Sequence, residues 1–322
     1  MTNLETRPQE SELHADQPGQ QPGSGAQLLE PREVPLGGVR GMRVRRTLPQ
    51  RGLPMVGAWC FLDEFGPVDV DMRVLPHPHT GLQTVTWPLV GEIRHRDSVG
   101  SDVVVRPGQL NLMTAGRGVA HSEMSLGDRP RLHGVQLWIA LPSAVAGIPP
   151  RFEQHTDLPV VAHDGVRATV LVGELEGARS AATAHSPLIG VELALEPGAS
   201  TVLPLQVGFE HALLVLDGVL EVGGVRQAPG PLRHLAPGLG RLALRSEHGA
   251  RALLIGGEPF AEDLVMWWNF LGRSHADILE AREDWERRDG QRFGAVAGHG
   301  DARIPAPELP RVRLTPRRRR RP

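Results

Sequence analysis

The chain has 322 residues, a formal net charge of −2 and a hydrophobic fraction of 40%. This length favours two domains, and the balanced charge excludes both a strongly basic nucleic-acid-binding protein and a charge-rich disordered protein. Because Cys60 is the only cysteine, an intrachain disulfide is excluded and a reducing compartment is expected. The sequence shows neither an apolar run of the ~20 residues that a membrane helix requires nor the pattern of a signal peptide, so we expect a cytoplasmic protein.

The chain divides into segments of different composition. Residues 1–32 are rich in Gln, Glu, Pro and Gly, which predicts a disordered N-terminal tail. Over residues 33–146, short apolar stretches such as LQTVTWPLV and VQLWIAL alternate with Gly, Pro and Asp, which is typical of β-strands separated by turns. The segment SAVAGIPPRF, with two prolines, predicts a connector. A second run of short strands follows within residues 150–258.

The two runs of strands resemble each other, which indicates an internal duplication. TWPLVGEI (86–93) aligns with LLVLDGVL (213–220), which places Gly91 opposite Gly218, and PGQLNLMTAG (107–116) aligns with PGPLRHLAPG (229–238). Two copies of one all-β unit of about 110 residues predict tandem barrels or sandwiches, each with its own core.

The last part of the chain has a helical pattern followed by a basic end. Within residues 259–300, Ser274 and Asp277 form a capping-box pattern, and Gly290 lies where a helix would end. The apolar stripe of this helix consists of Ile278, Ala281 and Trp285. Residues 301–322, which end in TPRRRRRP, are predicted to form a disordered basic tail. Five consecutive arginines without an aromatic platform or a recognition motif do not indicate nucleic-acid binding.

Two short motifs carry the strongest chemical signal. LPHPHTGLQTVTW places His77 and His79 two residues apart, and AGRGVAHSE gives His121 and Glu123 the same spacing. Because alternate side chains of a strand share a face, two such strands facing each other across a small barrel would direct all four side chains to one point. Three imidazoles and one carboxylate suit a first-row divalent metal and favour Fe(II). Zn, Cu, Ni and Mn also accept ligands of this type.

The second copy serves as an internal control for this site. A single H-x-H pair arises often by chance, but two pairs beside glycine and proline turns are a stronger signal. The positions aligned with the four candidate ligands are Pro204, Gln206, Ala243 and Arg245. Since this set is unsuited to a metal, we expect one metal per chain, in the N-terminal unit.

These motifs, in this order, resemble the core of pirin proteins. The matching segments are HPHTGLQTVTW, GEIRHRDS, PGQLNLMTAGRGVAHSEM and LHGVQLWIALP, with FLDEFGPV (61–68) before them and WWNFLGRSH (267–275) and RFG (292–294) after them. The resemblance implies an all-β fold of two tandem cupin (jelly-roll) barrels with a short C-terminal helix. It implies a metal-binding cupin over 33–146, a metal-free cupin over 150–258, and a closing segment over 259–300. It also implies a metal, usually iron, on His77, His79, His121 and Glu123.

One departure from the family pattern concerns the residues after the first histidine pair. Many pirins have HPHRGFET where this chain has HPHTGLQT, so Thr80 replaces an arginine and Gln83 replaces a carboxylate. If the strand alternation continues from His77, Gln83 points into the cavity, where an amide cannot act as a base.

Other polar and aromatic residues near these motifs support weaker expectations. We interpret His95, in GEIRHRDS, as a structural hydrogen-bonding residue, and His133 and Gln136 as candidates to orient a metal ligand. We expect the larger aromatic side chains to pack in the core rather than to bind substrate. These are Trp87, Trp138, Trp267 and Trp268.

The resemblance implies two classes of function. The first is a quercetin 2,3-dioxygenase, in which a flavonol chelates the metal, a carboxylate takes its proton and dioxygen opens the heterocycle, with Glu123 as ligand and base. The second is a non-enzymatic, iron-containing redox-sensing protein that binds a transcription factor or a metabolic enzyme. The expected partners are therefore a small aromatic substrate with dioxygen, or a protein, and we expect a monomer without membrane contact.

Overall fold

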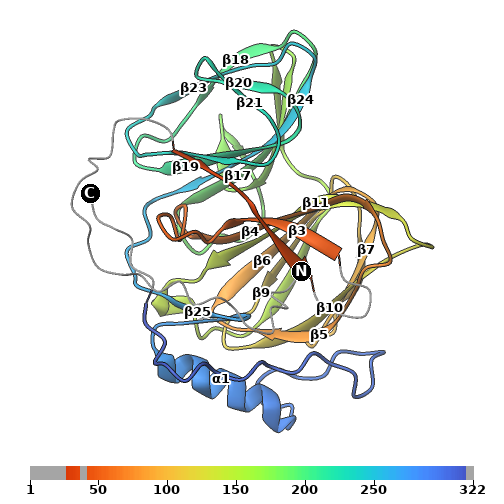
Figure 1. The fold of residues 1–322 in the computed structure, drawn as a ribbon. Helices are drawn as coiled ribbons and strands as arrows, with labels where there is room; N and C mark the ends of the chain where they lie inside the picture. The colour runs from red at the N-terminus through yellow and green to blue at the C-terminus, as the bar shows by residue number, and fades with distance from the viewer. Residues whose placement is uncertain (1–26, 37–41, 317–322) are drawn as a thin grey trace.

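The computed structural model describes residues 27–36 and 42–316, which form two lobes of β-structure and one helix (Figure 1). The all-β, two-cupin fold predicted from the sequence is confirmed. Two predicted disordered segments, residues 1–26 and the arginines within 317–322, lie outside the described residues. Among the described residues, no helix is long and apolar enough to cross a bilayer.

The N-terminal lobe consists of two antiparallel sheets. The larger has seven strands in the order β12-β9-β6-β11-β4-β3-β2, and the smaller has four in the order β5-β10-β7-β8. The strands are β2 (Arg32–Leu36), β3 (Met42–Leu48), β4 (Trp59–Asp69), β5 (Arg73–His79), β6 (Leu82–Val90), β7 (Ile93–Asp97), β8 (Asp102–Val105), β9 (Leu110–Thr114), β10 (Val119–Ser125), β11 (Arg131–Ala140) and β12 (Arg151–His155). A short 3-10 helix, η1 (Ser143–Val145), lies in the predicted connector.

The C-terminal lobe repeats this arrangement. Its sheets have the orders β1-β22-β19-β24-β17-β14-β13 and β18-β23-β20-β21, so every strand has a counterpart in the N-terminal lobe. The strands are β1 (Gln27–Leu29), β13 (Val160–His163), β14 (Val166–Val172), β17 (Leu188–Leu195), β18 (Ser200–Pro204), β19 (Glu210–Gly218), β20 (Leu220–Val222), β21 (Val225–Gln227), β22 (Leu232–Leu235), β23 (Arg241–Arg245) and β24 (Ala250–Gly257). Two hairpins complete the strands: β15 (Glu174–Leu175) with β16 (Ala178–Arg179), and β25 (Val265–Trp267) with β26 (Phe270–Gly272).

The duplication also appears in a backbone constraint that both copies share. Gly91 follows β6 with φ +85°, and Gly218 ends β19 with φ +72°. A Cβ atom would overlap the carbonyl oxygen of Arg131 at the first position and that of Gly249 at the second. Both turns therefore require glycine, for its positive φ and for the close approach of the neighbouring strand.

The lobes exchange edge strands. β1 pairs with β22 in the C-terminal lobe, which Figure 1 shows as the first strand reaching the upper lobe, whereas β12 pairs with β9 in the N-terminal lobe. The prediction of disorder up to residue 32 is therefore wrong for residues 27–32. Leu29 is buried, and the hydrogen bonds of β1 come from residues about two hundred positions later, which local composition cannot reveal.

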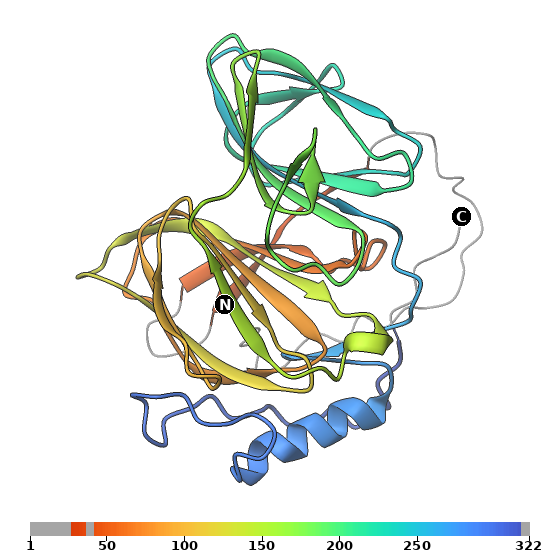
Figure 2. The ribbon, with the colours of Figure 1, turned by 180° about the vertical axis from the view of Figure 1, so that it is seen from behind.

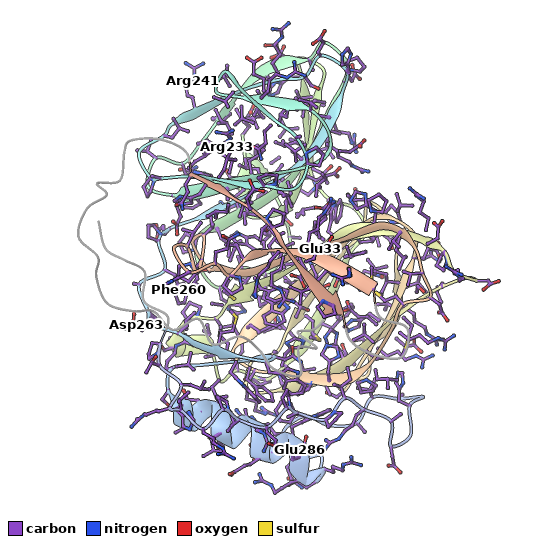
Figure 3. All side chains as sticks on the ribbon, viewed as in Figure 1. Glu33, Arg233, Arg241, Phe260, Asp263 and Glu286 are labelled. Atoms are coloured by element: carbon purple, nitrogen blue, oxygen red, sulfur yellow. The ribbon has the colours of Figure 1, made fainter. Side chains whose placement is uncertain are left out.

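The two seven-stranded sheets pack against each other in one shared core. Side chains of both lobes meet there, and Phe260, labelled in Figure 3, packs against this core after β24 ends. Trp59 donates its indole N–H to the carbonyl oxygens of Ile189 and Gly256, at 3.2 and 3.1 Å. One face of the large N-terminal sheet is thus covered by the other lobe, and its opposite face is turned toward the four-stranded sheet.

The predicted helix is confirmed as α1 (His275–Arg287), capped by Ser274 with the expected capping box. Figure 2 shows α1 along the underside of the N-terminal lobe. Its buried residues are Ile278, Ala281 and Trp285, as the apolar stripe predicted.

The ordered part of the chain continues further beyond α1 than predicted. Ile304 accepts a hydrogen bond from the Trp285 indole at 2.9 Å, and the buried Leu314 donates its backbone N–H to His275 Nδ1 at 3.1 Å. The prediction of a disordered tail from residue 301 is therefore wrong for residues 301–316. Their few apolar side chains pack on the helix, although the arginine-rich composition of the segment suggested a solvated chain.

Candidate metal centre

The two histidine-bearing motifs form neighbouring strands of one sheet. In the pairing of β5 with β10, His77 lies directly opposite His121, and His79 lies opposite Val119. The sequence-based picture of two strands facing each other across a barrel is thus wrong. The ligands converge because the strands are hydrogen-bonded neighbours, whose paired side chains lie about 5 Å apart on the same face.

A β-bulge in β5 allows the His77–His79 pair to point to the same face of the sheet as the His121–Glu123 pair. Glu123 pairs with Val74 and His121 with His77, so two residues of β5 between Val74 and His77 lie opposite one residue of β10 between His121 and Glu123. The extra residue returns His77 to the inner face, leaving Leu75 partly exposed. The imidazole of His77 donates from Nδ1 to the Leu75 carbonyl oxygen at 2.9 Å, which fixes the ring and leaves Nε2 toward the cluster.

The three imidazoles form a compact buried cluster. His79 Nε2 lies 3.1 Å from His121 Nε2, and the ring centroids of His77 and His121 are 4.3 Å apart. The buried His77 Nε2 has no hydrogen-bond partner among residues 27–36 and 42–316. Since imidazole nitrogens about 2.1 Å from one ion lie roughly 3.0 to 3.4 Å from each other, the cluster fits a bound first-row metal.

The ligand atoms of the four predicted metal-binding residues do not all lie close to one another. Two groups of three have ligand atoms within 4.8 Å of each other: His77, His79 and His121, and His95, His121 and Glu123. His121 belongs to both groups. Glu123 thus lies at the edge of the histidine cluster, and His95, which we interpreted as structural, lies beside it.

Glu123 is oriented from the facing sheet. The Thr86 hydroxyl on β6 lies 3.0 Å from Glu123 Oε1 and 3.0 Å from Gln136 Oε1 on β11. Both partners are acceptor oxygens, so the single hydroxyl proton of Thr86 is shared between the carboxylate of Glu123 and the side-chain oxygen of Gln136. Gln136 thus acts on the predicted carboxylate through Thr86, whereas His133 contacts Glu64 at 3.1 Å and does not contact the cluster.

His95 connects the cluster to a buried carboxylate. Its Nδ1 lies 3.4 Å from His121 Nδ1, its Nε2 lies 3.1 Å from Asp97 Oδ2, and its ring stacks on Phe152. Burial alone would raise the pKa of Asp97, but hydrogen bonds from His95 and Ser101 outweigh burial and lower that pKa. The sequence contained a signal for this pair, because the spacing of His95 and Asp97 repeats that of the ligand pairs.

Gln83 does not point toward the cluster. Its amide donates to Thr114 Oγ1 at 2.9 Å and to the Thr183 carbonyl oxygen at 3.0 Å, on the face of β6 that meets the other lobe. The expectation that it enters the cavity is wrong because β5 ends at His79 and the alternation restarts in β6.

The predicted aromatic side chains are all buried, in agreement with a packing role. Trp138 packs edge-on against the ring of His79, with centroids 5.1 Å apart, and stacks on Phe61. The ring of His79 is therefore held by a rigid aromatic wall. Cys60 is also buried, as expected, and its thiol lies 3.6 Å from the Trp138 carbonyl oxygen.

The closing segment covers the outer face of the same strands. Ala120, next to His121, packs in one cluster with the buried face of α1. His299 Nε2 lies 2.8 Å from the hydroxyl of Ser122, and Ile304 donates its backbone N–H to the Pro76 carbonyl oxygen at 2.8 Å. The strands that bear the cluster are thus packed on both faces.

The corresponding sheet of the C-terminal lobe is built differently. Its aligned residues Pro204, Gln206, Ala243 and Arg245 are exposed. In this sheet β18 and β23 pair without a bulge, and Arg241, labelled in Figure 3, also lies on the exposed face. The interior positions are Thr201 and three leucines, Leu203, Leu242 and Leu244. Both groups of candidate ligands found in the described part of the chain therefore lie in the N-terminal lobe.

The imidazoles of the cluster are neutral at physiological pH. Burial lowers the pKa of His77 from its ordinary value of 6.5 to about 3, and lowers the pKa of His79 and of His121 well below that value. A metal therefore competes with few protons for these nitrogens near pH 7.

The same shifts predict a pH-dependent stability of the metal-free protein. Below about pH 6.5 the histidines of the unfolded chain bind protons, whereas the buried histidines of the folded cluster stay neutral. The unfolded state therefore binds more protons than the folded state, and the free energy of unfolding falls as the pH decreases toward 3. Each such proton contributes a slope of about 1.4 kcal/mol per pH unit. Urea unfolding of chelator-treated protein at pH 7, 6 and 5 measures this slope.

A matched pair of variants assigns the slope to the cluster. His77→Gln should reduce the slope by about one proton, whereas His248→Gln should leave it unchanged, because His248 is 85% exposed. Equal slopes in wild type and His77→Gln would refute the assignment.

A repeated pair of sheets, with buried histidines between the sheets of one copy only, defines a two-cupin protein with a candidate metal centre in its N-terminal lobe. The family models agree: the Pirin model matches residues 41–139, and the Pirin C-terminal cupin domain matches residues 190–294. The chain belongs to the pirin family.

Relatives match nearly the whole chain. A Pseudomonas aeruginosa protein named "Putative quercetin 2,3-dioxygenase PA1205" is 45% identical over 288 residues, covering 88% of this chain and 90% of that protein. A pirin-like protein of Caulobacter vibrioides is 37% identical over 279 residues, covering 82% and 94%. The crystal structure of a quercetin 2,3-dioxygenase from Acinetobacter baumannii is 42% identical, with a TM-score of 0.85, and covers 90% of this chain and 98% of that chain.

Proposed function

We propose that this pirin is an Fe(II)-dependent dioxygenase that acts on flavonol-like substrates such as quercetin. The observation that carries the proposal is the buried cluster of three neutral imidazoles with the Glu123 carboxylate beside it. The similarity to proteins named as quercetin 2,3-dioxygenases supports the substrate class. We further propose that the metal is confined to the N-terminal cupin, residues 33–146, and that the C-terminal cupin, residues 150–258, is metal-free.

In this proposal His77, His79, His121 and Glu123 hold the metal. The bound metal would supply a Lewis-acid position that a flavonol can chelate and at which dioxygen reacts. Neutral histidines and one carboxylate are the mixed ligands that suit divalent iron, while Zn, Cu, Ni and Mn remain compatible with the same side chains.

Glu123 has the second role, that of general base. Its carboxylate is buried and is oriented by the hydroxyl of Thr86, so it can accept the proton of a flavonol hydroxyl at a defined position. In a site with little water, solvent does not compete for this proton, and the charge of the carboxylate is only weakly screened. Gln83, on the other face of β6, has no part in this step.

The test begins with protein purified without added metal. We expect elemental analysis of the full chain to find one equivalent of metal per chain. With iron at full occupancy, a flavonol should cause oxygen uptake matched by loss of the flavonol and release of gas. Full iron occupancy without turnover on a series of flavonols would instead favour the iron-containing redox sensor that binds a protein partner.

A further inference from the structure

We propose that Asp97 and His95 fix the tautomer of His121 and thereby present its Nε2 lone pair to the metal. This inference rests on the metal site proposed above and adds two positioning residues to it. The three side chains form a buried line, with His95 Nε2 facing Asp97 and His95 Nδ1 facing His121 Nδ1.

The line begins at a carboxylate whose position is fixed. Asp97 Oδ1 accepts the backbone N–H groups of Val99 and Ser101 at 3.0 and 2.9 Å, and Oδ2 faces His95 Nε2 at 3.1 Å. An ionised carboxylate only accepts hydrogen bonds, so His95 must carry its proton on Nε2.

The proton on His95 Nε2 decides the next contact. A neutral imidazole with a proton on Nε2 has a lone pair on Nδ1, which here faces His121 Nδ1 at 3.4 Å. His121 must therefore donate from Nδ1, which leaves the lone pair on its Nε2. That is the nitrogen 3.1 Å from His79 Nε2, inside the histidine cluster.

The ring of His95 is held in this orientation by its neighbours. It stacks on Phe152 with centroids 4.5 Å apart and an interplanar angle of 21°. The turn after β7 is tied to the ligand strand as well, because Ser98 donates its backbone N–H to the Ala120 carbonyl oxygen at 2.9 Å and its hydroxyl accepts from Ala120 N at 3.1 Å. Asp97 and His121 therefore keep a fixed separation, and such partners of metal-bound imidazoles set ligand orientation and basicity.

Asp97→Asn tests the inference with a minimal change in shape. The side-chain oxygen of the introduced asparagine must remain the acceptor for the two backbone N–H groups, so its NH₂ faces His95 Nε2. His95 then accepts at Nε2 and donates from Nδ1, and His121 acquires its proton on Nε2, where the metal should bind.

We expect Asp97→Asn to weaken Zn²⁺ binding about 10- to 100-fold, measured by chelator competition with the full chain. Long-range ¹H–¹⁵N spectra of histidine-labelled, metal-free protein should show the Nδ1–H tautomer of His121 in wild type and the Nε2–H tautomer in the variant. Asp102→Asn, at an exposed carboxylate on β8, is the control and should change neither measurement.

Two substitutions at His95 separate its two nitrogens. Asparagine places an acceptor oxygen near the position of Nδ1, whereas glutamine places a donor near the position of Nε2. We expect His95→Asn to bind Zn²⁺ more tightly than His95→Gln, because only the former still accepts from His121.

Two results would overturn the inference: an unchanged His121 tautomer with affinity within about twofold of wild type in Asp97→Asn, or a zinc-induced ¹⁵N shift showing that His95 is itself a ligand. The tautomers are measured without metal and the affinities without flavonol. A failure of the proposed dioxygenase activity is therefore distinguishable from a failure of this inference.

Discussion

Replacing Glu123 by glutamine is expected to lower flavonol turnover per bound metal by about 10²- to 10⁴-fold, the usual range for loss of a general base. The amide keeps the size of the side chain and one oxygen that can accept from Thr86, but it loses the charge and the basicity. The fold should therefore persist. The measurement is the rate of oxygen uptake with quercetin, divided by the metal content of each preparation, because the substitution also weakens a proposed ligand.

The control for Glu123→Gln is Glu92→Gln, which changes an exposed carboxylate paired with Arg106 and should leave turnover unchanged. The pH profile provides a second readout, since wild type should lose activity on the acid side as Glu123 protonates and the variant should not show this limb. Turnover per metal equal to wild type in Glu123→Gln would remove this residue as the base. Gln83 could not replace it, because its side chain faces the other lobe.

Replacing His121 by alanine is expected to abolish most metal binding, with a loss of affinity larger than the roughly 10- to 100-fold that follows from losing a partner of a ligand. His121 is common to both groups of candidate ligands, so neither group retains three members without it. Elemental analysis after dialysis against a weak chelator measures the effect.

Two histidines of the C-terminal lobe provide matched controls for His121→Ala. His211 is buried there, and burial lowers its pKa to about 4, while His248 is exposed. Neither His211→Ala nor His248→Ala should change the metal content. Equal loss of metal in all three variants would show that the site has been placed wrongly. Because His211→Ala also removes a buried side chain, it additionally controls for general destabilisation.

The sequence by itself determined the features that depend on short-range patterns. Strand alternation placed His77 with His79 and His121 with Glu123, and a capping box with an apolar stripe located α1. The duplicated glycine turns predicted two copies of one sheet arrangement, and both copies have it. These features are set by backbone geometry over a few residues, so they can be read locally.

Only the tertiary structure decided how these local pieces meet. The bulge in β5, the restart of alternation before Gln83 and the position of His95 beside His121 depend on which strands pair and in which register. β1 is likewise ordered because it pairs with β22, a strand of the C-terminal lobe. Register is set by contacts between residues far apart in the chain, and a shift of one residue turns every side chain to the other face, so local composition and spacing could not determine these features.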